Sequence, residues 1–529
     1  MTDLVHDFVL RSAASCPDAE ALVFREQTMA YGQLQSHISH GAAAYIGLGL
    51  SRSDRVAIYL EKRIESVVGA FAAAAAGGVF VPVNPLLKPD QVAYILNDCN
   101  VRILVTSVER LKLLAPVLSE CQDLQTVLVV GAAGNPDSLP GLTTVDWDRA
   151  LSASFSAQPH RVIDTDMAAI LYTSGSTGKP KGVVLSHRNL VAGAQSVAQY
   201  LENRASDRIL AALPLSFDAG FSQLTTAFHV GARVTLINYL LPRDILDAVV
   251  QERITGLTAV PALWIQLAQL KWPPAVTEHL RYIANTGGHM PKATLDRLRA
   301  ALPKTLPFLM YGLTESFRST YLPPSELDRR PDSIGKAIPN AEVLVVRENG
   351  TPCAPGEPGE LVHRGALVAL GYWNDAEKTA ERFKPVPNQP TGLVMPEIAV
   401  WSGDTVRTDE DGYIYFISRR DEMIKTSGYR VSPTEVEEIV YATGMVSETA
   451  ALGIPHPTLG QAIVVIATPR EGTDLDLDKL LAECRQRLPA FMVPALIKPR
   501  AGNLPRNPNG KIDRKLMAQE MQHLFESKS

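Results

Sequence analysis

A loop rich in glycine, hydroxyl and lysine residues offers the clearest chemistry in this sequence. Residues 172–182 read YTSGSTGKPKG. The three glycines let backbone N–H groups come close to an anion, while the hydroxyls and lysines add hydrogen-bond donors and positive charge. Apolar runs at 167–171 and 183–185 flank the segment, so we expect the loop to join two strands. Its spacing is not that of a Walker A loop, but its composition predicts phosphate binding.

Five further motifs follow this loop along the chain. They are YGLTE at 311–315, SGD at 402–404, RRD at 419–421, GYR at 428–430 and NGKIDR at 509–514. In this order the six segments resemble the adenylate-forming superfamily, which includes AMP-forming acyl-CoA synthetases, peptide-synthetase adenylation domains and beetle luciferases. The resemblance covers nearly the whole chain.

The composition excludes several other classes of protein. The chain has 529 residues, of which 46% are hydrophobic and 20% charged, and this length is sufficient for two or more domains. A formal charge of −5 argues against binding to nucleic acid or to an anionic membrane. The five cysteines are odd in number and lack CxxC spacing, so we expect buried or inert thiols in a reducing compartment.

A stretch at 67–83 is uncharged and mostly apolar, but it is rich in alanine and interrupted by Gly77 and Gly78. We therefore expect a buried helix that leads into a core strand rather than a membrane span. Acidic residues near the N-terminus argue against a signal peptide, and the C-terminal Ser-Lys-Ser is not a peroxisomal signal. The sequence thus predicts a cytoplasmic protein with no membrane insertion and no nucleic-acid partner.

The order of helical and strand patterns predicts an α/β fold. Up to about residue 330, amphipathic helices alternate with β-branched runs, which is typical of layered α/β sheets. Short strands between Gly/Pro turns predict a small β-rich subdomain at 335–420. We expect an N-terminal AMP-binding (adenylation) domain at 1–420. The resemblance implies that residues 421–529 form a smaller, mobile α+β lid.

The resemblance implies a reaction that begins with ATP. Joining a carboxylate to a nucleophile requires a leaving group better than hydroxide, and ATP supplies one by forming an acyl-adenylate with release of pyrophosphate. The residues expected around the phosphates are Thr173, Ser174, Gly175, Ser176, Thr177, Gly178 and Lys181. By the same resemblance, Thr314 contacts the α-phosphate, Glu315 helps to hold Mg²⁺ and Tyr311 stacks on or borders the adenine.

The resemblance implies further roles for the remaining motifs. Asp404 is expected to accept hydrogen bonds from the two ribose hydroxyls, with Arg419 beside the ribose or phosphate. Lys511 is expected to bridge the carboxylate and the α-phosphate, where an ammonium offsets developing negative charge. Lys511, Thr314 and Glu315 are therefore the predicted catalytic residues.

The resemblance also implies that the C-terminal domain rotates between two reaction steps. Asp421 is the expected hinge residue, and the face at 425–430 is expected to replace Lys511 after adenylation. Gly428 would let a thiol-bearing arm pass close to the backbone, with Arg430 beside the same tunnel.

The expected acyl pocket comprises Phe217, Asp218, Gly287 and Arg318. Many fatty-acyl and aryl synthetases carry a Pro-x-x-His segment, but here Pro214 leads to the Phe217-Asp218 pair, which resembles amino-acid-activating relatives. Asp218 is thus a candidate anchor for a substrate amine. Arg318 offers two alternatives, because it can pair with Asp218 or can receive a second carboxylate of the substrate. The sequence leaves these possibilities open.

Three functions follow from these residues. We favour an acid–thiol ligase that forms an acyl-CoA, with CoA as the acceptor. The alternative is a stand-alone adenylation enzyme that loads an amino acid or related acid onto the phosphopantetheine of a carrier protein, which would act in trans because no carrier domain is expected in this chain. The third, a scaffold without activity, is disfavoured by the intact motifs. The segment at 217–224 also resembles ligases that accompany bacterial exosortase A polysaccharide systems.

Overall fold

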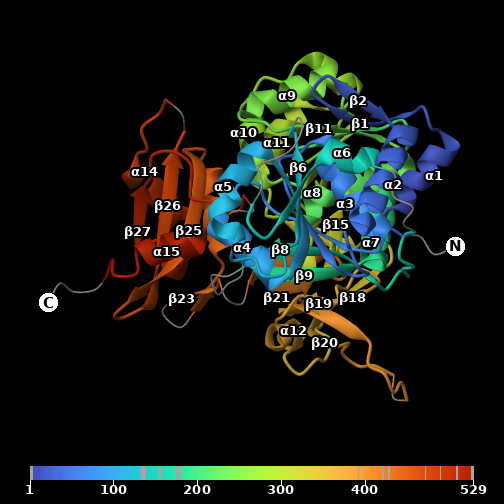
Figure 1. The fold of residues 1–529 in the computed structure, drawn as a ribbon. Helices are drawn as coiled ribbons and strands as arrows, with labels where there is room; N and C mark the ends of the chain where they lie inside the picture. The colour runs from blue at the N-terminus through green and yellow to red at the C-terminus, as the bar shows by residue number, and fades with distance from the viewer. Residues whose placement is uncertain are drawn as a thin grey trace.

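The computed structural model describes residues 4–132, 139–153, 158–173, 180–390, 392–419, 422–426, 429–470, 472–488, 490–507 and 510–525. A large N-terminal domain carries a smaller C-terminal domain at its side (Figure 1). Within the described residues the strands form three sheets, of fourteen, eight and five strands. The mixed α/β architecture expected from the sequence is confirmed.

The eight-stranded sheet lies in the N-terminal domain and has the order β19-β9-β8-β4-β3-β5-β6-β7. Its strands are β3 (Arg55–Tyr59), β4 (Val79–Pro82), β5 (Val101–Ser107), β6 (Thr126–Val130), β7 (Thr143–Asp146), β8 (Met167–Thr173), β9 (Lys181–Ser186) and β19 (Gly371–Tyr372). Most neighbours are parallel, but β8 and β9 pair antiparallel. The strands expected on either side of the phosphate loop are thus confirmed.

The fourteen-stranded sheet has the order β17-β18-β21-β22-β16-β15-β14-β13-β12-β10-β11-β1-β2, with β20 paired to β21. Its strands are β1 (Glu20–Phe24), β2 (Gln27–Ala30), β10 (Arg208–Ala211), β11 (Arg233–Leu236), β12 (Gly256–Ala259), β13 (Tyr282–Asn285), β14 (Leu306–Tyr311), β15 (Thr320–Leu322), β16 (Ser333–Ala337), β17 (Ala341–Val346), β18 (Gly359–Gly365), β20 (Phe383–Pro385), β21 (Ile398–Thr408) and β22 (Ile414–Arg419). The region at 335–420 is rich in strands, as expected. Its strands continue the fourteen-stranded sheet through β15 and β16.

Helices fill the space between these two sheets. Helix α3 (Ile64–Ala76) contacts β3 and β4 of one sheet and β1 of the other, while α8 (Asp218–Val230) contacts β10 and β11. The apolar stretch at 67–83 is therefore a buried helix followed by strand β4, as predicted. None of the helices in the described part of the chain has the length and apolar character needed to span a bilayer.

The other helices of the N-terminal domain pack against the sheets or against one another. They are α1 (Asp7–Ser15), α2 (Tyr31–Gly47), α4 (Pro89–Asp98), α5 (Val108–Leu118), α6 (Trp147–Ser152), α7 (His187–Tyr200), α9 (Pro242–Gln251), α10 (Pro261–Leu267), α11 (Lys292–Ala301) and α12 (Ala376–Arg382). All five cysteines are free; Cys99, Cys121 and Cys484 are buried, whereas Cys16 is exposed.

The C-terminal domain has its own sheet and its own core. Its elements are β23 (Ile424–Thr426), β24 (Tyr429–Val431), α13 (Pro433–Ala442), β25 (Val446–His456), β26 (Gly460–Pro469), α14 (Leu477–Arg487), β27 (Leu496–Pro499) and α15 (Arg514–Glu520). One apolar cluster includes Val436 of α13 and Leu480 of α14, and another includes Met517 of α15. The boundary at 420/421 falls outside the described residues and stays a prediction.

A buried histidine predicts how stability depends on pH. His363 on β18 is 0% exposed, and neither ring nitrogen has a hydrogen-bond partner within the described residues. Burial lowers the pKa of His363 to about 4. In the unfolded chain the imidazole of His363 binds a proton near pH 6.5, whereas in the folded chain it stays neutral until about pH 4. The free energy of unfolding is therefore unaffected by this histidine above pH 6.5 and decreases as the pH falls toward 4. We expect a loss of about 2 kcal/mol at about pH 5.

Thermal unfolding of the wild type and of His363→Leu should be compared at about pH 7.5 and about pH 5. The variant should lose less stability on acidification than the wild type, whereas His40→Gln, at an exposed site on α2, should behave like the wild type. An unchanged pH dependence in His363→Leu would contradict this account.

Candidate active site

The direction of the parallel strands gathers six of the candidate residues at one edge of the large sheet. Strands β10, β12, β13 and β14 run parallel to one another. The segments that follow them, at 212–218, 260–263, 286–289 and 312–318, therefore leave the sheet at the same edge. In open α/β sheets this carboxyl edge is where ligands bind.

Tyr311 and Asp404 come together at the candidate nucleotide site. The Tyr311 hydroxyl donates a hydrogen bond to Asp404 Oδ2, and Arg419 Nε lies 3.1 Å from Oδ1. The Asp404 carboxylate is 2% exposed, and burial raises its pKa against the opposing charge of Arg419. Oδ1 accepts no hydrogen bond from the described residues, so this buried oxygen is available to a ligand hydroxyl.

The backbone around Asp404 explains the residues that precede it. Gly403 has φ +71°, and a Cβ there would lie 2.0 Å from a guanidinium nitrogen of Arg382. Ser402 Oγ accepts from the Asp404 N–H at 3.0 Å and donates to the Leu361 carbonyl at 2.7 Å. Glycine and serine are thus needed here to hold the aspartate in place.

Glu315 and Lys181 meet at Tyr372, a residue that the sequence analysis missed. Thr314 and Glu315 lie in the short turn η2 (Thr314–Ser316), directly after β14. The Tyr372 hydroxyl donates to Glu315 Oε1 at 2.6 Å, and Lys181 Nζ lies 5.5 Å from the centre of the Tyr372 ring. Burial, together with the charge of Glu315, raises the pKa of Tyr372, which stays a neutral donor.

Several predicted residues lie outside the described part of the chain. Thr173 ends β8 opposite Lys181 on β9. The rest of the predicted phosphate loop (Ser174, Gly175, Ser176, Thr177 and Gly178) lies outside the described residues, as do Asp421 and Gly428. Arg430 is in β24, where only its backbone is described. The roles predicted for these residues stay predictions.

Asp218 and Arg318 form an ion pair in the candidate acyl pocket. Arg318 Nη1 lies 2.8 Å from Asp218 Oδ2 and also donates to the Phe317 carbonyl at 2.7 Å. The Arg318 side chain is 3% exposed, so it requires a negative partner. Phe217 precedes α8, and Asp218 is the first residue of that helix. Of the alternatives left open by the sequence, the pairing of these two residues is the one observed.

Lys511 reaches the pocket from the C-terminal domain. A Cβ added to Gly287, which has φ +77°, would lie 3.7 Å from Lys511 Cε. Arg506 and Ile512 bridge on either side of Lys511, and Arg506 Nη1 donates to the Gly510 carbonyl at 3.0 Å. This hairpin places the lysine stem next to the loop that follows β13.

Lys62, like Tyr372, lies at the candidate site although no sequence motif pointed to it. Its side chain is 8% exposed, and Nζ donates to the carbonyls of Ala212 at 2.7 Å and Leu213 at 3.4 Å. The backbone of Lys62 also exchanges two hydrogen bonds with the Asn238 side chain, at 3.1 and 2.7 Å. These contacts join the loop after β3 in one sheet to loops after β10 and β11 in the other.

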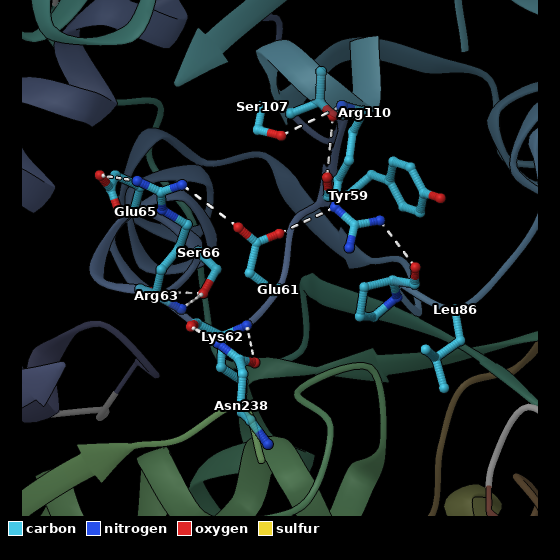
Figure 2. A network of polar contacts seen from close by, with 12 residues as sticks. Tyr59, Glu61, Lys62, Arg63, Glu65, Ser66, Leu86, Ser107, Arg110 and Asn238 are labelled. Carbon is cyan, nitrogen blue, oxygen red and sulfur yellow. Dashed lines mark hydrogen bonds and ion pairs between the residues drawn. The ribbon is translucent and has the colours of Figure 1, made fainter. Parts of the chain in front are cut away.

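The neighbouring acid does not neutralise Lys62. Figure 2 shows Glu61 pointing toward the guanidinium groups of Arg63 and Arg110, which lie 3.5 and 3.1 Å from its oxygens. Among the described residues no carboxylate pairs with Lys62 Nζ. Burial lowers the pKa of Lys62 to about 7. A buried amine therefore holds the carbonyls that lead into residues 214–218 of the pocket.

Comparison with known proteins identifies the family. The model of the AMP-binding enzyme family matches residues 9–373, and that of the AMP-binding enzyme C-terminal domain matches residues 435–511. The chain belongs to the AMP-binding enzyme family. It is an AMP-forming ligase with a large N-terminal and a small C-terminal domain.

Several relatives align with nearly the whole of this chain. The chain is 30% identical over 527 residues to an L-proline–[L-prolyl-carrier protein] ligase of Pseudomonas fluorescens, covering 98% of this chain and 99% of that protein. It is 30% identical over 513 residues to a feruloyl-CoA synthase of Amycolatopsis, covering 95% and 96%. It also matches gramicidin and tyrocidine synthases of Brevibacillus parabrevis, of whose length it spans only 8% to 13%.

A solved structure agrees along nearly the whole chain. The O-succinylbenzoate coenzyme A synthetase of Bacillus subtilis, in complex with ATP and a magnesium ion, superposes with a TM-score of 0.80 at 25% identity. The match covers 96% of this chain and 98% of that one.

Replacing Lys62 should weaken binding of the acid more than binding of the nucleotide. Lys62→Met keeps the apolar stem but leaves the Ala212 and Leu213 carbonyls without their donor. We expect the KM for the acid to rise about tenfold, the effect of roughly one lost buried hydrogen bond, with little change in the KM for ATP. Steady-state kinetics, with Lys271→Met at an exposed position as control, measure both constants. An equal rise in both KM values would contradict a role specific to the acyl pocket.

Proposed function

We propose that this protein activates a carboxylic acid with ATP and transfers the acyl group to the thiol of CoA. The observation that carries the proposal is the 2.8 Å ion pair between Asp218 and Arg318. Because Arg318 offsets the charge with which Asp218 would attract a substrate amine, the pocket favours acids without an α-amino group. The similarity to a feruloyl-CoA synthase supports the same assignment.

The first half-reaction forms the adenylate. A carboxylate oxygen attacks the α-phosphorus of ATP, the bond from that phosphorus to the bridging oxygen breaks, and pyrophosphate leaves. Lys511 would offset the negative charge shared by the carboxylate and the phosphate. Asp404 would accept hydrogen bonds from the ribose hydroxyls beside Tyr311, and Lys181 with the loop from Thr173 would hold the outer phosphates.

The chemistry of Glu315 fits Mg²⁺. Carboxylate oxygens are the ligands that this hard cation prefers. Tyr372 occupies Oε1, and within the described residues Oε2 has no hydrogen-bond partner. When bound, Mg²⁺ would reduce the negative charge of the phosphates, while Tyr372 keeps the carboxylate in place.

The second half-reaction forms the thioester. The sulfur of the thiol attacks the acyl carbon of the adenylate, the thiol proton passes to solvent, and the bond to AMP breaks. CoA and carrier-bound phosphopantetheine present the same thiol. The similarity to a carrier-protein ligase therefore supports a second candidate, transfer to a carrier protein in trans. Because ATP and CoA are cytoplasmic metabolites, we place the enzyme in the cytoplasm.

A hydroxamate-trapping assay over a panel of acids tests the substrate class. With ATP and Mg²⁺, fatty, aryl or dicarboxylic acids should give adenylate turnover, and amino acids of similar size should give at least about tenfold less because no free carboxylate awaits their ammonium group. Turnover confined to amine-bearing acids would instead make Asp218 the substrate anchor and would favour carrier loading.

Removing the Lys511 ammonium should separate the two half-reactions. Lys511→Ala is expected to slow adenylate formation by about 10² to 10³, the usual effect of losing one transition-state donor. The variant should still convert supplied acyl-adenylate to the thioester, because that step does not use this lysine. Single-turnover measurements of each step provide the test, and an equal loss in both would rule out this role.

A further inference from the structure

His289 joins the loop of the acyl pocket to the C-terminal domain. Its Nε2 is hydrogen-bonded and ion-paired to Glu438 Oε1 on α13. The side chains of His289 and Glu438 are 37% and 30% exposed, so the pair is partly shielded from water. Helix α13 also packs against α11 and β22 of the N-terminal domain. The pair is thus a polar contact across the interface of the two domains.

On the N-terminal side, the loop that carries His289 is held firmly. Asn285 Nδ2 donates to the Gly288 carbonyl at 2.8 Å, and Met290 is 4% exposed in the core around α11. Two residues before His289, Gly287 lies next to the Lys511 stem. One short loop therefore touches the C-terminal domain at both Lys511 and Glu438.

On the C-terminal side, α13 is tied to the segment that carries Lys511. Glu437, next to Glu438, accepts hydrogen bonds from Arg514 at 2.8 and 2.9 Å. Arg514 follows Lys511 by three residues. Helix α13 is therefore linked both to His289 and to the segment of Lys511, and Lys511 in turn lies next to Gly287. The position of α13 thus determines where Lys511 enters the acyl pocket.

The rest of the interface includes an opposing interaction. Arg297 on α11 faces Arg470 of the C-terminal domain, and burial together with the charge of Arg297 lowers the pKa of Arg470. Two like charges on facing domains disfavour their contact. The ion pair of His289 with Glu438 acts in the opposite sense and favours the observed orientation.

We propose that His289 is a positioning residue whose ion pair with Glu438 holds the C-terminal domain in the orientation that delivers Lys511 for adenylation. This proposal rests on the proposed function for the role of Lys511. A contact made in one orientation and absent from another shifts the balance between them by its own free energy. The pair favours adenylation and has to break before the domain can turn for thioester formation.

The proposal includes a pH dependence. Burial acts to lower the pKa of His289, but the hydrogen bond and charge of Glu438 outweigh it and raise the pKa above its ordinary value. Asp332 on the N-terminal domain and Glu437 on α13 act in the same direction. The pair needs the protonated imidazole, so it is complete below pH 6.5 and is lost as the pH rises through the raised pKa.

Acid-dependent pyrophosphate release should be measured for His289→Ala, Glu438→Ala and the double variant. Each single variant should slow adenylation about fivefold, as expected for a partly exposed ion pair, and the double variant should be no slower. Thioester formation from supplied acyl-adenylate should not fall. Lys292→Ala, which removes an exposed 2.7 Å pair within α11, is the control. Losses that multiply in the double variant, or equal losses in both half-reactions, would overturn the proposal.

His289→Lys provides a rescue that a purely structural role would not give. A lysine stays charged where the imidazole is neutral, so its rate relative to the wild type should rise between about pH 6 and about pH 9. A ratio that does not change with pH would overturn the titrating role of His289.

A measurement that needs no turnover separates this proposal from the proposed function. In a Cys16→Ser background, the pair His289→Cys and Glu438→Cys should form a disulfide under mild oxidation, and Lys292→Cys with Glu438→Cys should form much less. The locked enzyme should retain adenylation and lose thioester formation until it is reduced. Absence of the cross-link would overturn the positioning role. An enzyme that cross-links, and that after reduction still adenylates but fails to acylate CoA, would overturn the acceptor alone.

Discussion

The shared direction of the parallel strands is the constraint on which the rest of the site depends. Four loops of the large sheet leave at the same edge because β10, β12, β13 and β14 run the same way. The acyl pocket, the loop that meets Lys511 and the turn with Glu315 all belong to these loops. The C-terminal domain places Lys511 against this edge. The geometry of the large sheet therefore decides which residues of the C-terminal domain can reach the candidate active site.

Charge pairing gives the acyl pocket its character. A guanidinium as buried as that of Arg318 is costly without a negative partner, and Asp218 is that partner. The sequence named both residues but could not show whether they would meet, because the distance between them depends on how α8 and η2 pack. The same limit applies to Tyr311 and Asp404, which the motifs identified separately and the fold brings into contact.

The sequence predicted best those features that depend on residues close together in the chain. Strand patterns identified β8 and β9 on either side of the predicted phosphate loop, and the alanine-rich apolar stretch identified the buried helix α3. It gave no sign of residues whose roles come from distant partners. Tyr372 contacts a residue 57 positions away, and Lys62 and His289 contact residues 150 and 149 positions away. Membership of the exosortase-associated subfamily stays a prediction.

The continuity of the large sheet decides where this protein can be divided and recombined. The β-rich region shares a hydrogen-bonded ladder with the parallel strands through β15 and β16, so cutting the chain before β16 would leave two unpaired sheet edges open to aggregation. The C-terminal sheet has its own core and no ladder to the others within the described strands. Chimeras of such ligases should therefore exchange the C-terminal domain as a unit and should keep the β-rich region together with the parallel strands whose sheet it extends.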